Sequence, residues 1–167
     1  MESLKSLFRS FGYAFRGIFR TLAEERNMRI HAVCMVYMYT FLAVYDFFAV
    51  TRAQLALLFL ANALVVAAEL VNTAVEHAVD LAADAYRLHA KRAKDAAAGA
   101  VLVCAAFAVA VGVAVLGQRE AFRAMFAYYK ENPWMLAVLA FSIALATVFI
   151  FRGFGKRFSK SEEEDRL

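Results

Sequence analysis

Residues 55–80 read LALLFLANALVVAAELVNTAVEHAVD, an apolar run that continues directly into a stretch rich in acids. The apolar part is typical of a helix buried in a bilayer, where a crossing needs about 20 apolar residues. No Pro or Gly interrupts the run, so one helix is expected to continue through the acidic part. Ionisable side chains at membrane depth are costly and usually functional. The stretch therefore predicts a membrane helix with a polar site at one end.

The rest of the chain has the composition of a small integral membrane protein. It has 167 residues, of which 63% are hydrophobic, whereas soluble domains are about 45–50% apolar. Four stretches approach the length of a bilayer crossing, namely His31–Val50, Ala53–Ala68, Ala96–Leu116 and Trp134–Phe151. With one Pro and seven Gly, the chain has no long flexible linker. We therefore expect a single all-α bundle in the membrane.

The N-terminal segment predicts an amphipathic helix on the membrane surface. On a helical period its apolar residues share one face, namely Leu4, Leu7, Phe8, Phe11, Phe15, Ile18, Phe19 and Leu22. Its basic residues Lys5, Arg9, Arg16 and Arg20 share another. A signal peptide would instead have a continuous apolar segment. A core-facing helix of a soluble bundle has the same pattern, but the four spanning stretches that follow favour the interfacial position.

The connections predict the topology. The first spanning helix should end near Asp46 or Val50, and Thr51 with Gln54 fits a capping box that starts the second. Residues 81–95 read as a basic connection, and residues 117–133 as a second interfacial stretch with Tyr128, Tyr129 and Trp134 as belt aromatics. Lys and Arg are frequent in the N-terminal helix, the 81–95 connection and the tail after Phe151. The positive-inside rule therefore places these three segments on the cytoplasmic side.

The cysteines and the net charge exclude several classes of protein. Cys34 and Cys104 both lie in apolar segments and share no metal-ligand spacing with the histidines, so neither a disulfide nor a metal framework is expected. The net charge of +4 is spread along the chain. This distribution suits anionic lipid headgroups better than nucleic acid.

Polar residues of the acidic stretch fall on one helix face. Glu69, Asn72, Glu76 and Asp80 are spaced 3, 4 and 4 residues apart, which confines them to about 80° of arc over three turns. Such a stack of carboxylates is stable if a cation lies against it, and Mg²⁺ with substrate phosphates is the natural candidate. The alternative is a helix end that leaves the bilayer, with its acids paired to Arg87, Lys91 and Arg92.

Two further clusters near the same membrane face favour the site. Lys94 and Asp95 precede the third span; Lys94 can reach a phosphate, and Asp95 can cap the helix or bind a ribose or a metal. Glu24 and Glu25 precede the first span from the same side. Together these residues predict a site for a polyphosphate and a divalent metal beside lipid.

The motifs ELVNTAVEHAVDL, AKRAKDAAAGAVL and EERNMRIHA resemble the prokaryotic diacylglycerol kinase and undecaprenol kinase family over residues 10–117. The resemblance implies a small membrane kinase with an amphipathic surface helix and three spanning helices. It also implies homotrimers with active sites shared between protomers, on the cytoplasmic side of the bacterial cytoplasmic membrane. Such kinases transfer the γ-phosphate of ATP to a lipid hydroxyl with Mg²⁺, and the expected partners include no nucleic acid.

The resemblance also implies roles for individual residues. Glu69 matches the general base, Asn72 a polar support, and Glu25 and Glu76 the metal ligands. The residues that match the ATP site are Tyr13, Glu25, Glu76, Asp80, Tyr86, Lys94 and Asp95. Arg9 and Arg16 on the surface helix are weaker matches, for a lipid headgroup or the nucleotide.

The chain departs from the family beyond its third span. We divide it into residues 1–30, the interfacial helix and entry to the first span; 31–117, the kinase core; and 118–167, an extension with a fourth span and a polar tail. The motifs lie closer to the undecaprenol branch, with diacylglycerol as the alternative substrate. A scaffold, a small transporter or a lipid phosphatase remains an alternative class, although no broken helix of a transporter and no phosphatase nucleophile is evident.

Overall fold

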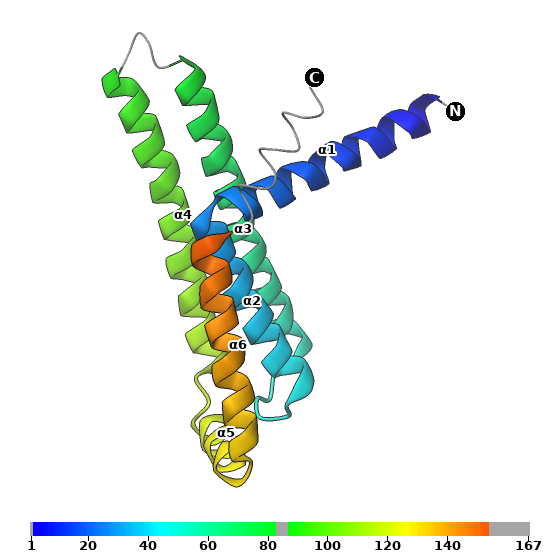
Figure 1. Cartoon of the computed structure of the whole chain (residues 1–167), viewed down its shortest axis with the longest axis vertical. Helices are drawn as coiled ribbons and strands as arrows, with labels where there is room; N and C mark the ends of the chain where they lie inside the picture. Colours follow the sequence, from blue (N-terminus) through cyan, green and yellow to red (C-terminus); the bar gives the residue numbers. More distant parts are fainter. Residues whose placement is uncertain (1, 83–86, 154–167) are drawn as a thin grey trace.

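The computed structural model describes residues 2–82 and 87–153, and this part of the chain is helical throughout apart from short connections (Figure 1). Its helices are α1 (Glu2–Glu24), α2 (Arg26–Val44), α3 (Arg52–Ala82), α4 (Arg87–Leu116), α5 (Arg119–Glu131) and α6 (Pro133–Arg152). The prediction of an all-α fold is confirmed.

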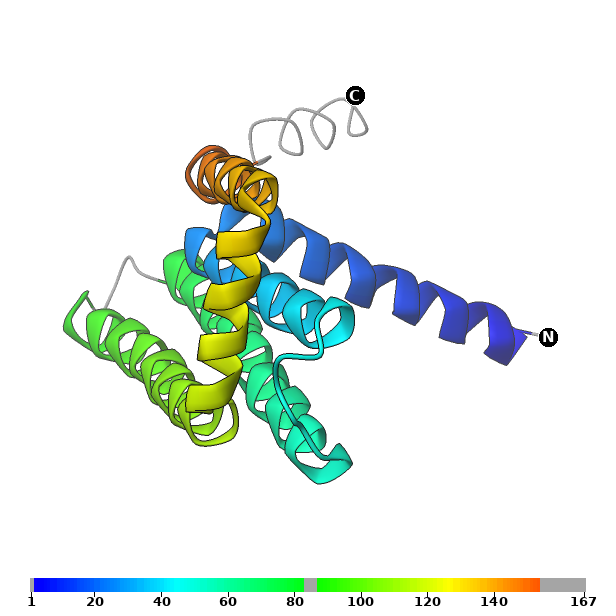
Figure 2. The same cartoon turned by 90° about the horizontal axis from the view of Figure 1, so that it is seen from below.

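Four helices form a bundle along the long axis of the molecule. α2, α3, α4 and α6 run side by side, α1 projects sideways near one end, and α5 lies across the opposite end (Figures 1 and 2). The C-terminal part of α3 and the N-terminal part of α4 extend beyond the point where α1 leaves the bundle (Figure 1). We call this end the site end, because the acidic stretch of α3 lies there.

Three helices are long and apolar enough to cross a membrane: α3, residues Leu88–Leu116 of α4, and α6. The sequence predicted four crossings, and α2 is long enough at 19 residues but is not apolar enough to be counted with these three helices. It begins at Arg26 and ends at Val44, so it includes the polar residues of RNMRIH and loses the apolar segment before Val50. The predicted first span, His31–Val50, is therefore corrected to a 19-residue helix whose first turns are polar.

The start of α3 follows the predicted capping box. Thr51 Oγ1 accepts a hydrogen bond from the backbone N–H of Gln54 at 3.2 Å, and Gln54 Oε1 accepts one from the N–H of Thr51 at 2.9 Å. This reciprocal pair satisfies backbone donors that a helix N-terminus leaves free. It fixes where the chain turns back into the bundle after α2.

The start of α4 differs from the prediction. Residues 81–95 were expected to form a connection, but α3 continues to Ala82 and α4 already begins at Arg87. Lys94 and Asp95 therefore lie within α4, and the prediction that Asp95 caps the helix is wrong. Basic side chains are compatible with helical backbone, so this part of the chain is helical well before the apolar segment begins.

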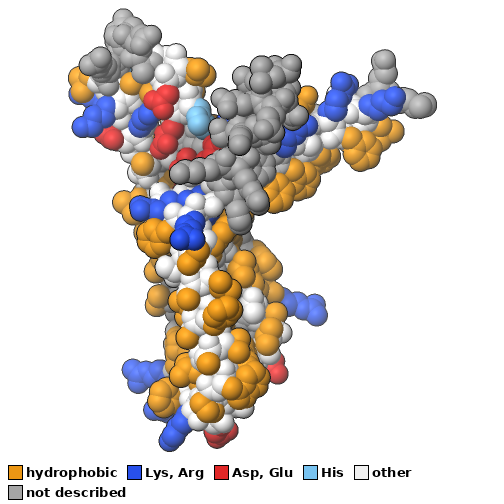
Figure 3. Space-filling model, in the orientation of Figure 1, with side chains coloured by type: hydrophobic (Ala, Val, Ile, Leu, Met, Phe, Trp, Pro, Cys, Tyr) orange, Lys and Arg blue, Asp and Glu red, His pale blue; other side chains and the backbone are white. Residues whose placement is uncertain are grey.

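The two amphipathic helices lie at opposite ends of the bundle. α1 keeps its apolar residues exposed along its length, including Phe8, Phe11 and Phe15, and only its last turn is buried, at Thr21 and Ala23. Figure 3 shows basic side chains on one side of α1 and hydrophobic ones on the other, and a largely hydrophobic surface along the bundle. This distribution agrees with a helix in the interface and a bundle in lipid.

One polar contact joins α2 and α3 in the middle of the bundle. Asn62, the polar residue in the middle of α3, donates a hydrogen bond to Tyr39 Oη on α2 at 2.9 Å and another to the Leu58 carbonyl at 2.8 Å. Asn62 therefore has a structural role between α2 and α3. Cys34 and Cys104 are both free thiols.

Candidate active site

The predicted acidic face of α3 runs from the buried interior to the surface. Glu69 is 1% exposed, Asn72 and Glu76 are half-buried, and Asp80 is exposed. The order follows from the helical spacing, because each residue lies about one turn further along α3 than the previous one. Burial therefore decreases along this face from Glu69 to Asp80.

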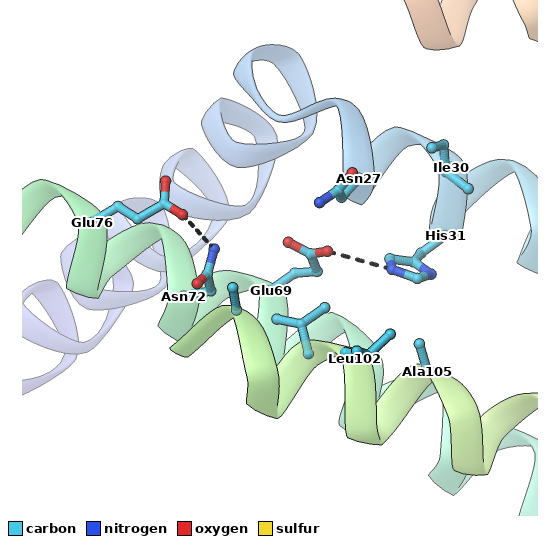
Figure 4. A pocket seen from close by; sticks show the side chains of 10 residues that line it. Asn27, Ile30, His31, Glu69, Asn72, Glu76, Leu102 and Ala105 are labelled. Atoms are coloured by element: carbon cyan, nitrogen blue, oxygen red, sulfur yellow. Dashed lines mark hydrogen bonds and ion pairs between the residues drawn. The ribbon is translucent and has the colours of Figure 1, made fainter. Parts of the chain in front are cut away.

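Three of these residues line one cavity, of about 320 Å³, between α2, α3 and α4. Figure 4 shows Glu69, Asn72 and Glu76 on one wall, Asn27, Ile30 and His31 of α2 opposite, and Leu102 and Ala105 of α4 below. The wall contributed by α4 is wholly apolar among the described residues, namely Ala98, Val101, Leu102 and Ala105. The cavity thus combines a row of oxygen and nitrogen groups with a hydrophobic side.

The backbone carbonyl of Glu69 accepts a side-chain hydrogen bond, whereas one oxygen of its carboxylate has no hydrogen-bond partner among the described residues. The Thr73 hydroxyl donates to the Glu69 carbonyl at 3.0 Å. Glu69 Oε1 lies 3.4 Å from His31 Nε2, near enough for an ion pair, yet it is buried and makes no hydrogen bond within the described residues. A buried polar atom without a partner is rare in a folded protein. Glu69 Oε1 lies in the cavity wall, so it is an acceptor that a group in the cavity can use.

Asn72 has one satisfied and one unsatisfied polar atom. Its amide nitrogen donates to Glu76 Oε1 at 2.9 Å, which fixes the Glu76 carboxylate (Figure 4). Its Oδ1 is buried without a hydrogen-bond partner in the part of the chain that the structure describes. Asn72 therefore supports Glu76 directly, and it presents an acceptor of its own.

A third carboxylate lies near the first two. Glu25 is the N-cap residue of α2, in an extended conformation between α1 and α2, and both Glu25 and Glu76 interact electrostatically with Glu69. No group of three or more His, Cys, Asp and Glu within residues 2–82 and 87–153 is arranged to hold a metal ion. Mg²⁺, however, is commonly bound through one or two carboxylates and substrate phosphates. The donors present fit such a shared site.

Lys94 and Asp80 meet at the outer part of the site end. Lys94 Nζ on α4 forms an ion pair with Asp80 Oδ1 on α3, and both side chains are partly exposed. Neither they nor Asp95, which is exposed, line the cavity around Glu69. Tyr86 lies outside the described residues. The structure thus places an inner group, Glu69 to Glu76, and an outer pair that bridges α3 and α4.

The residues predicted on α1 are not brought to the cavity within one chain. Tyr13 is 64% exposed, and the guanidinium of Arg16 lies over its ring at 5.3 Å. Arg9 is also exposed, and α1 points away from the bundle (Figure 1). These side chains form a separate basic and aromatic surface along α1.

Two residues of the cavity were not predicted from the sequence. Asn27 and His31 are one helical turn apart on α2 and face Glu69 (Figure 4). His31 begins an apolar segment of the sequence, and nothing in that segment indicates that its side chain lies beside Glu69. The spacing of four residues between two polar side chains after Glu25 is the signal that would have indicated a second polar face.

Comparison with known proteins agrees with this geometry. The family model of the prokaryotic diacylglycerol kinases matches residues 12–116. An undecaprenol kinase of Bacillus subtilis is 40% identical over 116 residues, which are 68% of this chain and 90% of that protein. A diacylglycerol kinase of Synechocystis is 43% identical over 112 residues, which are 66% of this chain and 62% of that protein. No solved structure matches. The chain therefore belongs to the prokaryotic diacylglycerol kinase family.

Proposed function

We propose that this protein transfers the γ-phosphate of ATP to the hydroxyl of a membrane lipid, and that the cavity around Glu69 is where the lipid hydroxyl binds. The matching family is that of the prokaryotic diacylglycerol kinases, and both relatives are named as lipid kinases. The observation that supports the location is Glu69 Oε1, which is buried in the wall of a cavity with an apolar side and has no hydrogen-bond partner among the described residues. A lipid that enters from the bilayer needs an acceptor for the proton of its hydroxyl and an apolar surface for its chain.

Each group in the cavity then has a role in the transfer. Glu69 Oε1 accepts the proton of the lipid hydroxyl as that oxygen attacks the γ-phosphorus, and the bond from phosphorus to the β-γ bridging oxygen breaks. Phosphoryl transfer depends mainly on positioning and on neutralisation of charge. Lys94, at the outer end of α4, neutralises phosphate charge after it releases Asp80. Asp95, Tyr86 and Tyr13 are proposed as further contacts of the nucleotide.

Mg²⁺ is proposed as the metal that accompanies ATP. Glu76 and Glu25 would hold it with phosphate oxygens, and Asn72 orients the Glu76 carboxylate through its 2.9 Å hydrogen bond. When bound, the ion screens the negative charge of the phosphates. The Glu69 carboxylate is repelled by both Glu25 and Glu76, which is consistent with a site whose charge is balanced by bound cations.

The site is proposed to face the cytoplasm and to be completed by a neighbouring protomer of a homotrimer. Arg9, Tyr13 and Arg16 lie on a helix that projects away from the cavity of its own chain. They could serve a nucleotide only in a site that another copy helps to form. ATP is available on the cytoplasmic side, where the Lys- and Arg-rich segments are expected.

Undecaprenol is the proposed lipid, and diacylglycerol is the second candidate. The relative from Bacillus subtilis, of which 90% is covered by the match, is an undecaprenol kinase. A transporter or scaffold is less well supported, because Asn62, the midspan polar residue, is engaged in structural hydrogen bonds.

The first test is lipid phosphorylation by the purified protein in detergent with labelled ATP and Mg²⁺. Undecaprenol and diacylglycerol are supplied separately and in competition. We expect preferential labelling of undecaprenol, by about tenfold or more in kcat/KM. Preferential labelling of diacylglycerol would replace the lipid assignment, and labelling of neither by a folded preparation would reject the kinase.

A second test concerns His31. Because His31 Nε2 lies 3.4 Å from Glu69 Oε1, its removal should let the carboxylate change rotamer. We expect His31→Ala to lower kcat by about tenfold, with a smaller change in the KM for ATP. Asn62→Ala serves as the control, since it removes a polar contact between the same two helices away from the cavity. Equal kinetic losses in both variants would contradict a specific role for His31.

A further inference from the structure

The C-terminal extension contacts α2 or the residue just after it at three positions along the bundle, through one ring contact and two hydrogen bonds. At the end far from the site, the ring of Tyr45, just after α2, packs edge-on against Tyr128 of α5 at 5.4 Å between centroids. In the middle, Tyr37 Oη donates to Ser142 Oγ at 2.8 Å. At the site end, Arg29 Nε donates to the Ile150 carbonyl at 2.9 Å. Polar contacts between membrane helices fix their register.

A side-chain amide fastens the beginning of the extension as well. Gln118 Oε1 accepts from the backbone N–H of Ala49 at 3.1 Å, and Gln118 Nε2 donates to the Ala49 carbonyl at 3.0 Å. The same nitrogen donates to Val115 at the end of α4. The start of the extension is thus tied to the connection between α2 and α3, and α6 returns from there to the site end.

Arg29 joins three helices at the site end. Besides Ile150 of α6, its guanidinium donates to the carbonyl of Ala23 at 2.7 Å and, more weakly, to that of Leu22 at 3.4 Å, both in the last turn of α1. Arg29 itself belongs to α2 and is 5% exposed. Carbonyls at helix C-termini lack intrahelical donors and carry partial negative charge, so a cation there is favourable. We call these contacts the Arg29 bridge.

Gly153 shows that the end of α6 is shaped to fit the Arg29 bridge. Its φ is +54°, a conformation that favours glycine. A Cβ at this position would lie 2.8 Å from Arg29 Nη1, 2.9 Å from Cζ and 3.0 Å from the Ala23 carbonyl. A side chain at residue 153 would therefore be strained and would also displace the guanidinium or the end of α6.

The Arg29 bridge acts on the part of the chain that carries the site. Arg29 lies four residues after Glu25 and two before His31. It fixes the last turn of α1, which contains the buried residues Thr21 and Ala23. We propose that the extension positions Glu25 and α1 for Mg·ATP through Arg29, a positioning residue that does not itself touch the reactants. This inference rests on the proposed function, and it gives residues 118–153 a role in the site.

Gly153→Ala in the full-length protein tests the inference, with Gly112→Ala as a matched control. Gly112 is a helical glycine with open space around it. We expect Gly153→Ala to raise the KM and the directly measured Kd for Mg·ATP by about tenfold, because displacement by about 1 Å can cost ~100-fold in a positioned site. The maximal rate at saturating ATP and the KM for lipid should change little. Hydrogen exchange should accelerate in residues 20–31.

Arg29→Lys supplies the second variant. Arg29 reaches the carbonyls of Ile150 and Ala23 from two separate nitrogens of its planar guanidinium. The compact ammonium group of Lys lacks this geometry, so it should not restore the bridge. Arg29→Lys should raise the KM and Kd for Mg·ATP as much as Gly153→Ala does. The double variant should raise them no further than either single variant, because both substitutions remove one shared contact.

The outcomes separate positioning from general stability. Partial unfolding would lower the maximal rate and leave the Kd of the folded fraction unchanged, and that pattern would overturn the inference. Unchanged Kd and unchanged exchange in both variants would overturn it as well. If the wild type binds Mg·ATP but phosphorylates no lipid, the proposed function fails while the Kd values still decide the role of Arg29.

Discussion

Glu69→Gln should reduce lipid phosphorylation by about 10²–10⁴-fold, the range that a general base contributes, while the thermal stability in detergent stays equal or rises. The amide has the shape of the carboxylate but cannot accept the hydroxyl proton. The charge that is removed lies at 1% exposure, close to Glu25 and Glu76. Because burial of a charge among like charges is unfavourable, the neutral side chain relieves repulsion. Loss of activity together with retained or increased stability is the signature of a functional group.

Glu120→Gln is the matched control for this prediction. Glu120 lies at the start of α5, at the opposite end of the bundle, and its partner is Arg123 at 3.1 Å on an exposed surface. The same chemical change there should alter neither activity nor stability, since exposed ion pairs contribute about 0–1 kcal/mol. Retention of more than about a tenth of the activity by Glu69→Gln would remove Glu69 from the role of general base.

The features that the sequence predicted correctly are those set by local spacing. The amphipathic pattern of the N-terminal residues depends on helical periodicity alone, and it gives α1. Thr51 and Gln54 form their reciprocal hydrogen bonds within three residues of chain. The placement of Glu69, Asn72, Glu76 and Asp80 on one face of α3 also follows from their spacing on one helix. No knowledge of neighbouring helices is needed for any of these.

The features that the sequence missed depend on contacts between distant segments. His31 faces Glu69 only because α2 packs on α3, and Arg29 meets Ile150 across 121 residues of chain. The basic composition of residues 81–95 predicts a connection, whereas α4 begins at Arg87, because Lys and Arg are good helix formers. The bounds of the first span were also misplaced, because the predicted stretch His31–Val50 begins after the polar first turns of α2 and continues past its end at Val44.

Glu76→Gln should lower kcat/KM for ATP by about 10²-fold or more, the scale of losing one electrostatic contact to the transferring phosphate. Glu76 and Glu69 lie two helical turns apart on one face of α3, so their roles can be separated by the dependence on Mg²⁺. A weakened metal ligand raises the Mg²⁺ concentration needed for half-maximal activity. Excess Mg²⁺ should therefore restore part of the activity of Glu76→Gln and none of that of Glu69→Gln.

The hydrogen bond from Asn72 makes this second experiment interpretable. In Glu76→Gln the new amide oxygen can still accept from Asn72 Nδ2, now 2.9 Å from Glu76 Oε1, so the side chain keeps its position and loses only its charge. Asn72→Ala does the opposite, because it keeps the charge and removes the orientation. We expect it to show the same shift in Mg²⁺ dependence with a smaller loss, of about 10–100-fold, as outer supports of metal ligands do. If Mg²⁺ restores neither variant, Glu76 acts on the phosphates or the nucleotide directly, and the metal is held elsewhere.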